Sequence, residues 1–469
     1  MMVKERQGTL WGSVAVFALV LGVLMYGILG LKLSAHLPLV AAIAIVTLYG
    51  RFCLGISLKE LETCVSENAK GAPFLILLTI GVLIASWILS GTVPYLVELG
   101  LRFISPKWFL PFVLLICGLL AMVTGSAWTT CATLGVAFLA ISISMGIPAG
   151  MTVAAVVGGA FFGEKQSPVS DVTAFAASVS KVDLMRHVRY MTYTSMPAMA
   201  VGMVLLLIFG LRFQGVNADL GQIARIREEL NSAFVLSPWA LLPILVLGIA
   251  IARKLPGVHA MMLSAAVAMV QAVVIQKMDL QQVLSMIYGG VSLNTGSETV
   301  DAICNRGGFV FMTSNLMMLV CSLGLGGVLN RTKVLAIIVE HLSPWISSRF
   351  SLVVMTLLSS SIVIFFTGSP AVGYAITGSA LCDKYDEKKV DRVVLARTIS
   401  DAATLQQPLV PWGASGAFVA NCFGVAAMEI APWYFVGWLM PLFALVWGLT
   451  GIGCPEQRRD ATENTCEIW

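Results

Sequence analysis

Apolar stretches of about 20 residues recur along almost the whole chain, and this pattern constrains the fold more than any other feature. A helix of that length rises about 30 Å, which is the thickness of the hydrocarbon core of a bilayer. The composition agrees, since 58% of the 469 residues are apolar and only 12% are charged. In soluble domains, about 45–50% of residues are apolar and about 25% are charged. The pattern predicts an all-α polytopic membrane protein and excludes a soluble enzyme, a disordered chain and a disulfide-built fold.

The apolar stretches and the loops between them define the expected spans. The stretches lie near 13–33, 36–52, 72–93, 108–124, 127–146, 150–163, 191–213, 237–252, 258–276, 308–329, 350–367 and 431–453. We therefore expect about twelve transmembrane helices. Lys4 and Arg6 precede the first span, which places the N-terminus on the cytoplasmic side by the positive-inside rule. The expected location is a bacterial cytoplasmic membrane, crossed several times. The net charge of +4 is spread over many short loops, so no nucleic-acid partner is expected.

Segments that match one another in the same order indicate an internal repeat. Residues 83–93 match 319–329, the Thr-Gly-Ser tripeptide at 124–126 recurs at 367–369, and Pro168 recurs as Pro408, all at nearly the same offset. Chance similarity among helices rich in Gly, Ser and Leu is the alternative. We expect two pseudo-symmetric repeats with broken helices, an organisation typical of secondary transporters. The expected parts are 1–70 with two spans and an amphipathic linker, 71–215 as the first repeat, 216–304 as a linker with two spans, 305–453 as the second repeat, and 454–469 as a polar tail.

The first candidate site follows an apolar helix that ends in the segment GEKQSPVSDVT, residues 163–173. A carboxylate at membrane depth is costly, so Glu164 and Asp171 point to function. Pro168 disfavours helix at Ser167, and the break frees backbone groups to face a cavity. Thr173 adds a hydroxyl. The alternatives are that Asp171 caps the following helix and that Glu164 forms an interfacial ion pair with the adjacent lysine.

The second candidate site lies in residues 397–418 and repeats this design. Asp401, Thr404 and Gln407 precede Pro408 within an otherwise apolar context. The segment again combines an acid, a hydroxyl, an amide and a proline that breaks a helix. A purely structural role is the alternative for Asp401.

The two Thr-Gly-Ser motifs supply a third group of candidates. Ser126 and Thr129 belong to the first motif and its extension, and Thr367 and Ser369 belong to the second. Glycine at a turn lets the backbone approach a ligand closely, and the hydroxyls supply neutral oxygens. Close helix packing by small residues is the alternative.

This collection of oxygen atoms suits a hard monovalent cation and a proton. Hard cations prefer oxygen ligands, and burial lets a proton compete with the cation for a carboxylate. We expect Na⁺ at Asp171 and Asp401, in one midplane site that both halves share. The full set of expected ligands is Glu164, Ser167, Asp171 and Thr173 with Ser126 and Thr129 from the first half, and Thr367, Ser369, Asp401, Thr404 and Gln407 from the second.

These segments carry a resemblance to a known family. GGAFFGEKQSPVSDVT (158–173) and TLQQPLVPWGASGAF (404–418) look like the paired signature segments of the NhaC-type Na⁺/H⁺ antiporter family, in the ion transporter superfamily. SGTVPYLVELGL (90–101), TGSAWTT (124–130) and NRGG (305–308) also fit. The resemblance implies inverted repeats and a Na⁺/H⁺ antiporter that works by alternating access in the lipid bilayer. It implies no cofactor, since Na⁺ and H⁺ are transported ions, and it leaves a homodimer open.

Other functional classes fit these residues less well or remain open. Within transporters, a Na⁺- or H⁺-coupled carrier of a small organic acid or amino acid stays open, because similar members include malate/lactate antiporters. An enzyme is not expected: residues 413–416 match the GxSG of intramembrane serine proteases, but all four histidines precede Ser415. A channel is disfavoured because two repeats with broken helices are typical of alternating access.

Overall fold

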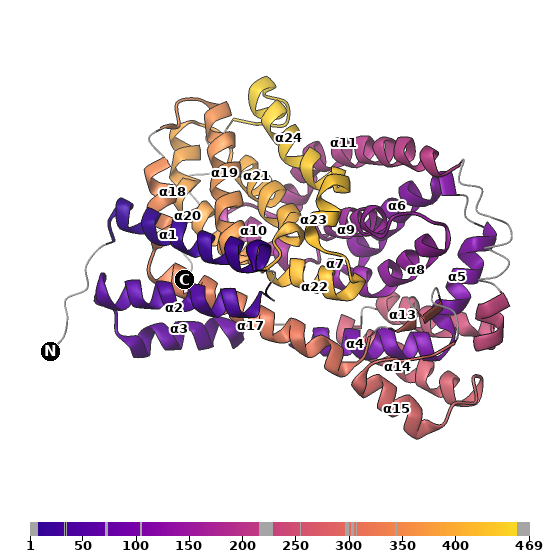
Figure 1. The fold of residues 1–469 in the computed structure, drawn as a ribbon. Helices are drawn as coiled ribbons and strands as arrows, with labels where there is room; N and C mark the ends of the chain where they lie inside the picture. Colours follow the sequence, from indigo (N-terminus) through magenta and orange to yellow (C-terminus); the bar gives the residue numbers. More distant parts are fainter. Residues whose placement is uncertain are drawn as a thin grey trace.

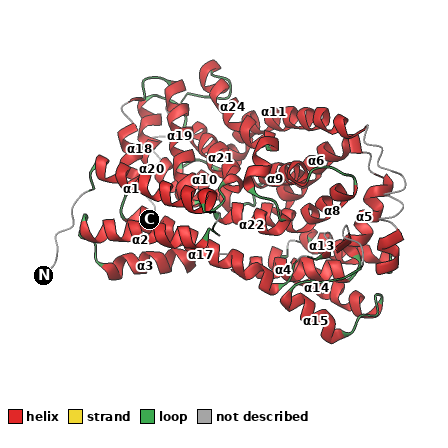
Figure 2. Cartoon of the chain, viewed as in Figure 1, coloured by secondary structure: helices red, strands yellow, loops and turns green. Residues whose placement is uncertain are grey.

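The computed structural model describes residues 8–31, 33, 35–70, 74–103, 106–214, 228–253, 255–295, 300–301, 304–305, 307–342 and 345–456. Within these ranges the chain is helical, and the extended pairing consists of a single isolated bridge between Val390 and Glu456 (Figure 2). The expected all-α class is therefore confirmed. Most of the expected polar tail, from residue 457 on, lies outside the described residues.

The helices form four consecutive groups along the chain. The first comprises α1 (Leu10–Met25), α2 (His36–Phe52) and α3 (Leu58–Lys70). The second comprises α4 (Phe74–Leu89), α5 (Thr92–Phe103), α6 (Pro106–Thr124), α7 (Ala127–Thr130), α8 (Val136–Ser144), α9 (Ala149–Gln166), α10 (Asp171–Val179) and α11 (Leu184–Gly210). The third comprises α13 (Leu242–Ala252), α14 (Gly257–Val274) and α15 (Leu280–Gly289). The fourth comprises α17 (Phe309–Arg331), α18 (Val334–Leu342), α19 (Arg349–Thr367), α20 (Pro370–Glu387), α21 (Arg392–Gln406), α22 (Ala414–Phe423), α23 (Ala427–Ile430) and α24 (Phe435–Thr450).

Several of these helices are long and apolar enough to cross a membrane. Among the described residues, four single helices meet that criterion, and three bent pairs meet it if each pair is one span. The single helices are Leu10–Ile28, Lys107–Thr124, Leu184–Gly210 and Arg349–Thr367. The bent pairs turn by 67° between α4 and α5, 59° between α17 and α18, and 83° between α22 and the segment ending at Trp433. Five shorter apolar helices accompany them, as expected for a polytopic membrane protein with broken helices.

The second and fourth groups contain the same series of elements. Each opens with a bent pair, α4–α5 or α17–α18, followed by a helix that ends at a left-handed glycine, α6 or α19. A helix beginning just after a serine follows, α7 or α20, and then a helix that ends before a proline, α9 or α21. A short helix, α10 or α22, and a final long helix, α11 or α24, complete each series. The order of elements thus parallels the sequence matches, while the repeat boundaries and the inversion stay predictions.

The first and third groups cover the opposite series. α1, α2 and α3 pack on α17 and α18, and an ion pair of 2.5 Å joins Glu60 of α3 to Arg331 of α17 (Figure 1). α14 and α15 pack on α4, where the indole of Trp87 donates a hydrogen bond of 3.0 Å to Ser264 of α14. The helices that precede one series therefore cover the bent pair of the other.

Helices α6 and α9 pack most closely because α9 presents glycines to its neighbour. A β-carbon added to Gly163 would lie 2.7 Å from both the β-carbon of Ala121 and the backbone nitrogen of Met122. A β-carbon added to Gly159 would lie 3.0 Å from that of Cys117. Small residues that let helices approach are the usual packing device within membranes. Here they fix the end of α9, where the candidate site begins.

We predict that Gly163→Ala lowers the free energy of unfolding by about 1–3 kcal/mol, because the methyl group overpacks the contact with α6. Unfolding by sodium dodecyl sulfate in mixed micelles measures the change. Gly248→Ala is the matched control, since an added β-carbon there meets nothing within 4 Å. An equal loss in both variants would show that the close approach of α9 to α6 contributes nothing.

Candidate functional site

A cavity of about 400 Å³ lies where the broken helices of both series meet. Four helices begin at its wall: α7 and α10 from the first series, and α20 and α22 from the second. Figure 1 shows α10 and α22 near the centre of the molecule, between the two series. The residues that line the cavity are Gly125, Ser126, Trp128, Glu164, Val169, Asp171, Val172, Leu323, Gly368, Ser369, Pro370, Gln407, Ala414 and Ser415. No cluster of three or more His, Cys, Asp or Glu side chains that could hold a metal ion occurs among the described residues.

The two Thr-Gly-Ser motifs form the same turn, and each turn contributes residues to the wall of this cavity. Gly125 and Gly368 end α6 and α19 with φ angles of 71° and 61°, in the left-handed region that favours glycine. In the second turn, Thr367 accepts a hydrogen bond of 3.3 Å from the backbone nitrogen of Ser369, and Thr124 accepts an equivalent bond of 3.3 Å in the first. Each turn brings its serine to the cavity wall.

Two hydroxyls expected at the site lie behind the wall. Thr129 donates a hydrogen bond of 3.0 Å to the hydroxyl of Ser126, and Thr367 donates one of 2.8 Å to the carbonyl of Val363. Neither is among the described residues that line the cavity. Their observed contacts shape the turns that carry Ser126 and Ser369.

Glu164 reaches the cavity from the last turn of α9. Its side chain is only 6% exposed, and Oε1 accepts a hydrogen bond of 3.0 Å from the backbone nitrogen of Ala127. Ala127 is the first residue of α7, so a carboxylate lies at the positive end of that helix dipole. The alternative in which Glu164 pairs with Lys165 is wrong, since Lys165 has a different partner.

Asp171 lines the cavity as the first residue of α10. Its Oδ1 accepts a hydrogen bond of 2.9 Å from the backbone nitrogen of Val172, while Ser170 is the residue that caps the helix, accepting from Thr173. Ser170 therefore caps α10, so the alternative in which Asp171 is the cap is wrong. Asp171 instead adds a negative charge to the first turn. The wall that the first series contributes thus carries a carboxylate at each of two helix starts, those of α7 and α10.

Ser167 and Thr173 hold the break between α9 and α10 in place. Thr173 donates its hydroxyl proton to the carbonyls of Glu164 and Lys165, at 3.2 and 3.0 Å, which satisfies acceptors left free at the end of α9. The hydroxyl of Ser167 accepts a bond of 3.4 Å from the backbone nitrogen of Val169. Both residues were expected as ligands, and the structure places them beneath the cavity wall instead.

A chain of hydrogen bonds joins the two series across the cavity. The indole nitrogen of Trp128 donates to the hydroxyl of Ser415 at 3.2 Å, and that hydroxyl donates to Oε1 of Gln407 at 2.8 Å. Trp128 also stacks on Phe418, with ring centroids 4.9 Å apart. Gln407 was expected at the site, whereas Trp128 and Ser415 were missed. The only sequence signal for them was their place inside two segments that fit the family, TGSAWTT (124–130) for Trp128 and TLQQPLVPWGASGAF (404–418) for Ser415.

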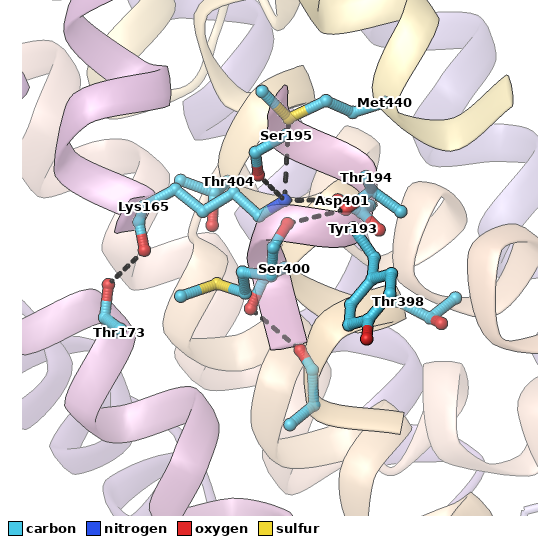
Figure 3. A network of polar contacts seen from close by, with 12 residues as sticks. Lys165, Thr173, Tyr193, Thr194, Ser195, Thr398, Ser400, Asp401, Thr404 and Met440 are labelled. Atoms are coloured by element: carbon cyan, nitrogen blue, oxygen red, sulfur yellow. Dashed lines mark hydrogen bonds and ion pairs between the residues drawn. The ribbon is translucent and has the colours of Figure 1, made fainter. Parts of the chain in front are cut away.

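Asp401 forms a buried ion pair with Lys165, which follows Glu164 in α9 (Figure 3). The side chains are 0% and 1% exposed, and Asp401 also accepts a hydrogen bond of 2.9 Å from Thr194. Lys165 donates a further bond of 3.2 Å to Ser195. The bonds of Asp401 to Lys165 and to Thr194 cross between the two series, so Asp401 ties α21 to both α9 and α11.

This placement separates Asp401 from the other expected ligands. Of the described residues, neither Asp401 nor Thr404 lines the cavity, and Thr404 is hydrogen bonded to the hydroxyl of Tyr374. The structure therefore brings Gln407 and Ser369 to Asp171 but leaves Asp401 with Lys165. The structure does not group Asp401 with Asp171 as expected. The sequence does not show which neighbouring helix each side of a buried helix contacts.

We predict strong coupling between Lys165 and Asp401. Asp401→Asn or Lys165→Met alone leaves one buried charge without its partner and costs about 3–5 kcal/mol of unfolding free energy. The double variant is expected to lose clearly less than the sum of the two losses, as measured by unfolding in mixed micelles. The exposed pair Lys384–Glu387, at 2.9 Å, is the control, and its single variants are expected to lose about 0–1 kcal/mol. Additive losses at Lys165 and Asp401 would contradict the coupling.

Comparisons with known proteins identify the family of this chain. A model of the Na⁺/H⁺ antiporter family matches residues 159–452. The chain is 34% identical to the Na⁺/H⁺ antiporter NhaC of Alkalihalophilus pseudofirmus, over 97% of this chain and 98% of that one. It is 33% identical to a malate-2H⁺/Na⁺-lactate antiporter of Bacillus subtilis, over 96% of each chain. It is also 33% identical to the arginine/ornithine antiporter ArcD of Halobacterium salinarum, over 91% of this chain and 89% of that one.

These matches cover the two series of helices and both signature segments. The resemblance drawn from residues 158–173 and 404–418 is thereby confirmed, and so is an integral membrane transporter. This chain belongs to the Na⁺/H⁺ antiporter family.

Proposed function

We propose that this chain exchanges Na⁺ for H⁺ across the cell membrane, and that both ions bind in the cavity between the two series. The observation that carries the proposal is the pair of carboxylates, Glu164 and Asp171, on one wall of a cavity built from broken helices. Glu164 is buried, and a buried carboxylate inside a membrane protein marks an ion or proton pathway by default because its burial is costly, whereas Asp171 is exposed and adds a second charge to the same cavity.

The cavity supplies oxygen atoms of the kind that Na⁺ prefers. Glu164 and Asp171 contribute charge, and the hydroxyl of Ser126 contributes a neutral oxygen. Protonation of the carboxylates removes the charge that holds the cation. Na⁺ and H⁺ therefore compete for one site, and competition of this kind is enough to couple their movements in opposite directions.

The Lys165–Asp401 pair supports a site that both series move around. Glu164 faces the cavity and Lys165 faces α21, so one turn of α9 connects ion binding to a contact between the series. The same order of elements in the two series, and their crosswise cover, support two inverted repeats that alternate in exposing the cavity to each side.

Alternation of this kind predicts that Ser126→Cys and Ser369→Cys change their accessible side together. We expect a membrane-impermeant thiol reagent to label both from either side in a cysteine-free background, with protection by Na⁺ because both residues line the cavity. Labelling of both from one side only, under all ion gradients, would contradict alternating access.

We predict that Glu164→Gln lowers the rate of Na⁺-driven proton release from proteoliposomes at least about tenfold. The reason is that the neutral amide neither binds the cation strongly nor exchanges a proton. A pH-sensitive dye inside the vesicles measures the flux. Glu62→Gln on the exposed face of α3 is the control and is expected to transport normally. Unimpaired exchange in Glu164→Gln, with the protein folded, would remove the carboxylate from the mechanism.

Coupled transport of a small organic acid or amino acid is the second candidate. It is favoured by the other wall of the cavity, where α20 and α22 begin without any acidic side chain among the described lining residues. Na⁺ added alone to proteoliposomes separates the two: proton movement without an organic substrate supports exchange of the ions, and movement only with an added carboxylate supports the carrier.

A further inference from the structure

The helices that begin at the cavity differ in how their first turns are capped. In the first series, α7 has Ser126 as its cap and Glu164 on its first backbone nitrogen. In the same series, α10 has Ser170 as its cap and Asp171 on its second nitrogen. Each of these helix starts is therefore satisfied by a hydroxyl and a carboxylate of the chain itself.

The second series has neither a capping hydroxyl nor a carboxylate at the matching helix starts. Ser369 precedes α20 and Gly413 precedes α22, and no side chain of the described residues caps either helix. Thr404 stands four residues before Pro408, as Glu164 stands four before Pro168, but its hydroxyl is bonded to Tyr374. Pro411 stands where Asp171 would be. The second series thus presents two positively polarised helix ends without a carboxylate.

These two helix ends converge. A β-carbon added to Gly413 would lie 2.9 Å from the α-carbon of Gly368, so the backbones that lead into α22 and α20 touch. Ser369, only 8% exposed, follows Gly368 and lines the cavity. Its hydroxyl makes no capping hydrogen bond with the described residues at the start of α20, so it is free to donate to a molecule in the cavity. A hydroxyl donor therefore faces the cavity beside both helix ends.

We propose that the carboxylate of a small organic acid binds between the N-termini of α20 and α22 and accepts a hydrogen bond from Ser369. The cation that accompanies it lies at the opposite wall, with Glu164 and Asp171. Backbone N–H groups and helix dipoles are a ready anion site, and Glu164 on α7 is an internal example of a carboxylate in the same position. A cavity of about 400 Å³ accommodates an acid of a few carbons.

The inference rests on the proposed function, because it places the organic substrate in the cavity where the ions bind. It adds which group of the substrate is recognised and where. A hydroxy acid and an amino acid both carry such a carboxylate. With a hydroxy acid, a separate Na⁺ binds at the wall that holds Glu164 and Asp171. With an amino acid, the substrate's own ammonium group binds there.

Binding to the purified full-length protein tests the proposal. L-lactate, L-malate, L-alanine and L-ornithine are titrated by isothermal calorimetry, each with Na⁺ and with choline as the cation, and NaCl alone reports Na⁺ binding. Ser369→Ala removes the hydroxyl donor without removing a hydrogen bond that the fold uses. Ser369→Asp places a covalent carboxylate at the start of α20, where the ligand's carboxylate would bind. Ser379→Asp adds the same charge on an exposed position of α20 and is the matched control.

We expect wild-type protein to bind at least one of these carboxylates and Ser369→Ala to weaken that binding about tenfold, as for one hydrogen bond to a charged group. Ser369→Asp is expected to abolish carboxylate binding while keeping Na⁺ binding, and Ser379→Asp to behave like wild type. Lactate binding that requires Na⁺ would support the proposal with Na⁺ at the wall that holds Glu164 and Asp171. Alanine binding that does not require Na⁺ would support it with the substrate's ammonium group at that wall.

Two results would overturn the inference without touching ion exchange: Na⁺ binding with no response to any of the carboxylates, or carboxylate binding that both Ser369 variants leave unchanged. Absence of Na⁺ binding in the wild type would instead overturn the proposed function. Should Ser369→Asp fail to fold, the Ser369→Ala titration alone decides the location of the carboxylate.

Discussion

The structure depends on one constraint: within hydrocarbon, a backbone N–H or C=O that leaves a helix must find another partner. Breaks near Pro168 and Pro408 release such groups, and the chain gathers the breaks around a cavity rather than exposing them to lipid. Thr173 satisfies carbonyls at the end of α9, and the threonine hydroxyls of the Thr-Gly-Ser turns accept from the backbone N–H groups of Ser126 and Ser369. What the chain leaves unsatisfied at the cavity wall is therefore available to a ligand.

The last turn of α9 combines two environments within adjacent residues. Glu164 faces a cavity and a helix start, whereas Lys165 faces α21 and is paired with Asp401. An ion that changes how Glu164 is held also acts on the backbone that carries Lys165. Because interfaces between packed helices switch between discrete arrangements, this short segment can link occupancy of the cavity to the relation between the two series.

Much of this architecture could be predicted from the sequence, because apolar length and proline position act locally. The stretch at 36–52 coincides with α2, and that at 350–367 is within one residue of α19. The turns at Ser126 and Ser369 reached the predicted cavity. The Lys165–Asp401 pair was not predicted, since pairing depends on which side of each buried helix faces the other, and α9 and α21 are buried all round. For the same reason the sequence could not show that α1–α3 pack on α17 rather than on α4.

That crosswise cover has a consequence for how the protein is made. While the ribosome is still synthesising the middle of the chain, α4 has already entered the membrane, but its covering helices α14 and α15 have not yet emerged. The N-terminal helices α1–α3 likewise wait for α17, which is synthesised much later. Neither half can complete its own packing, so assembly ends only when the last series arrives. A truncated product would therefore present unfilled helix faces to the quality-control proteases of the membrane.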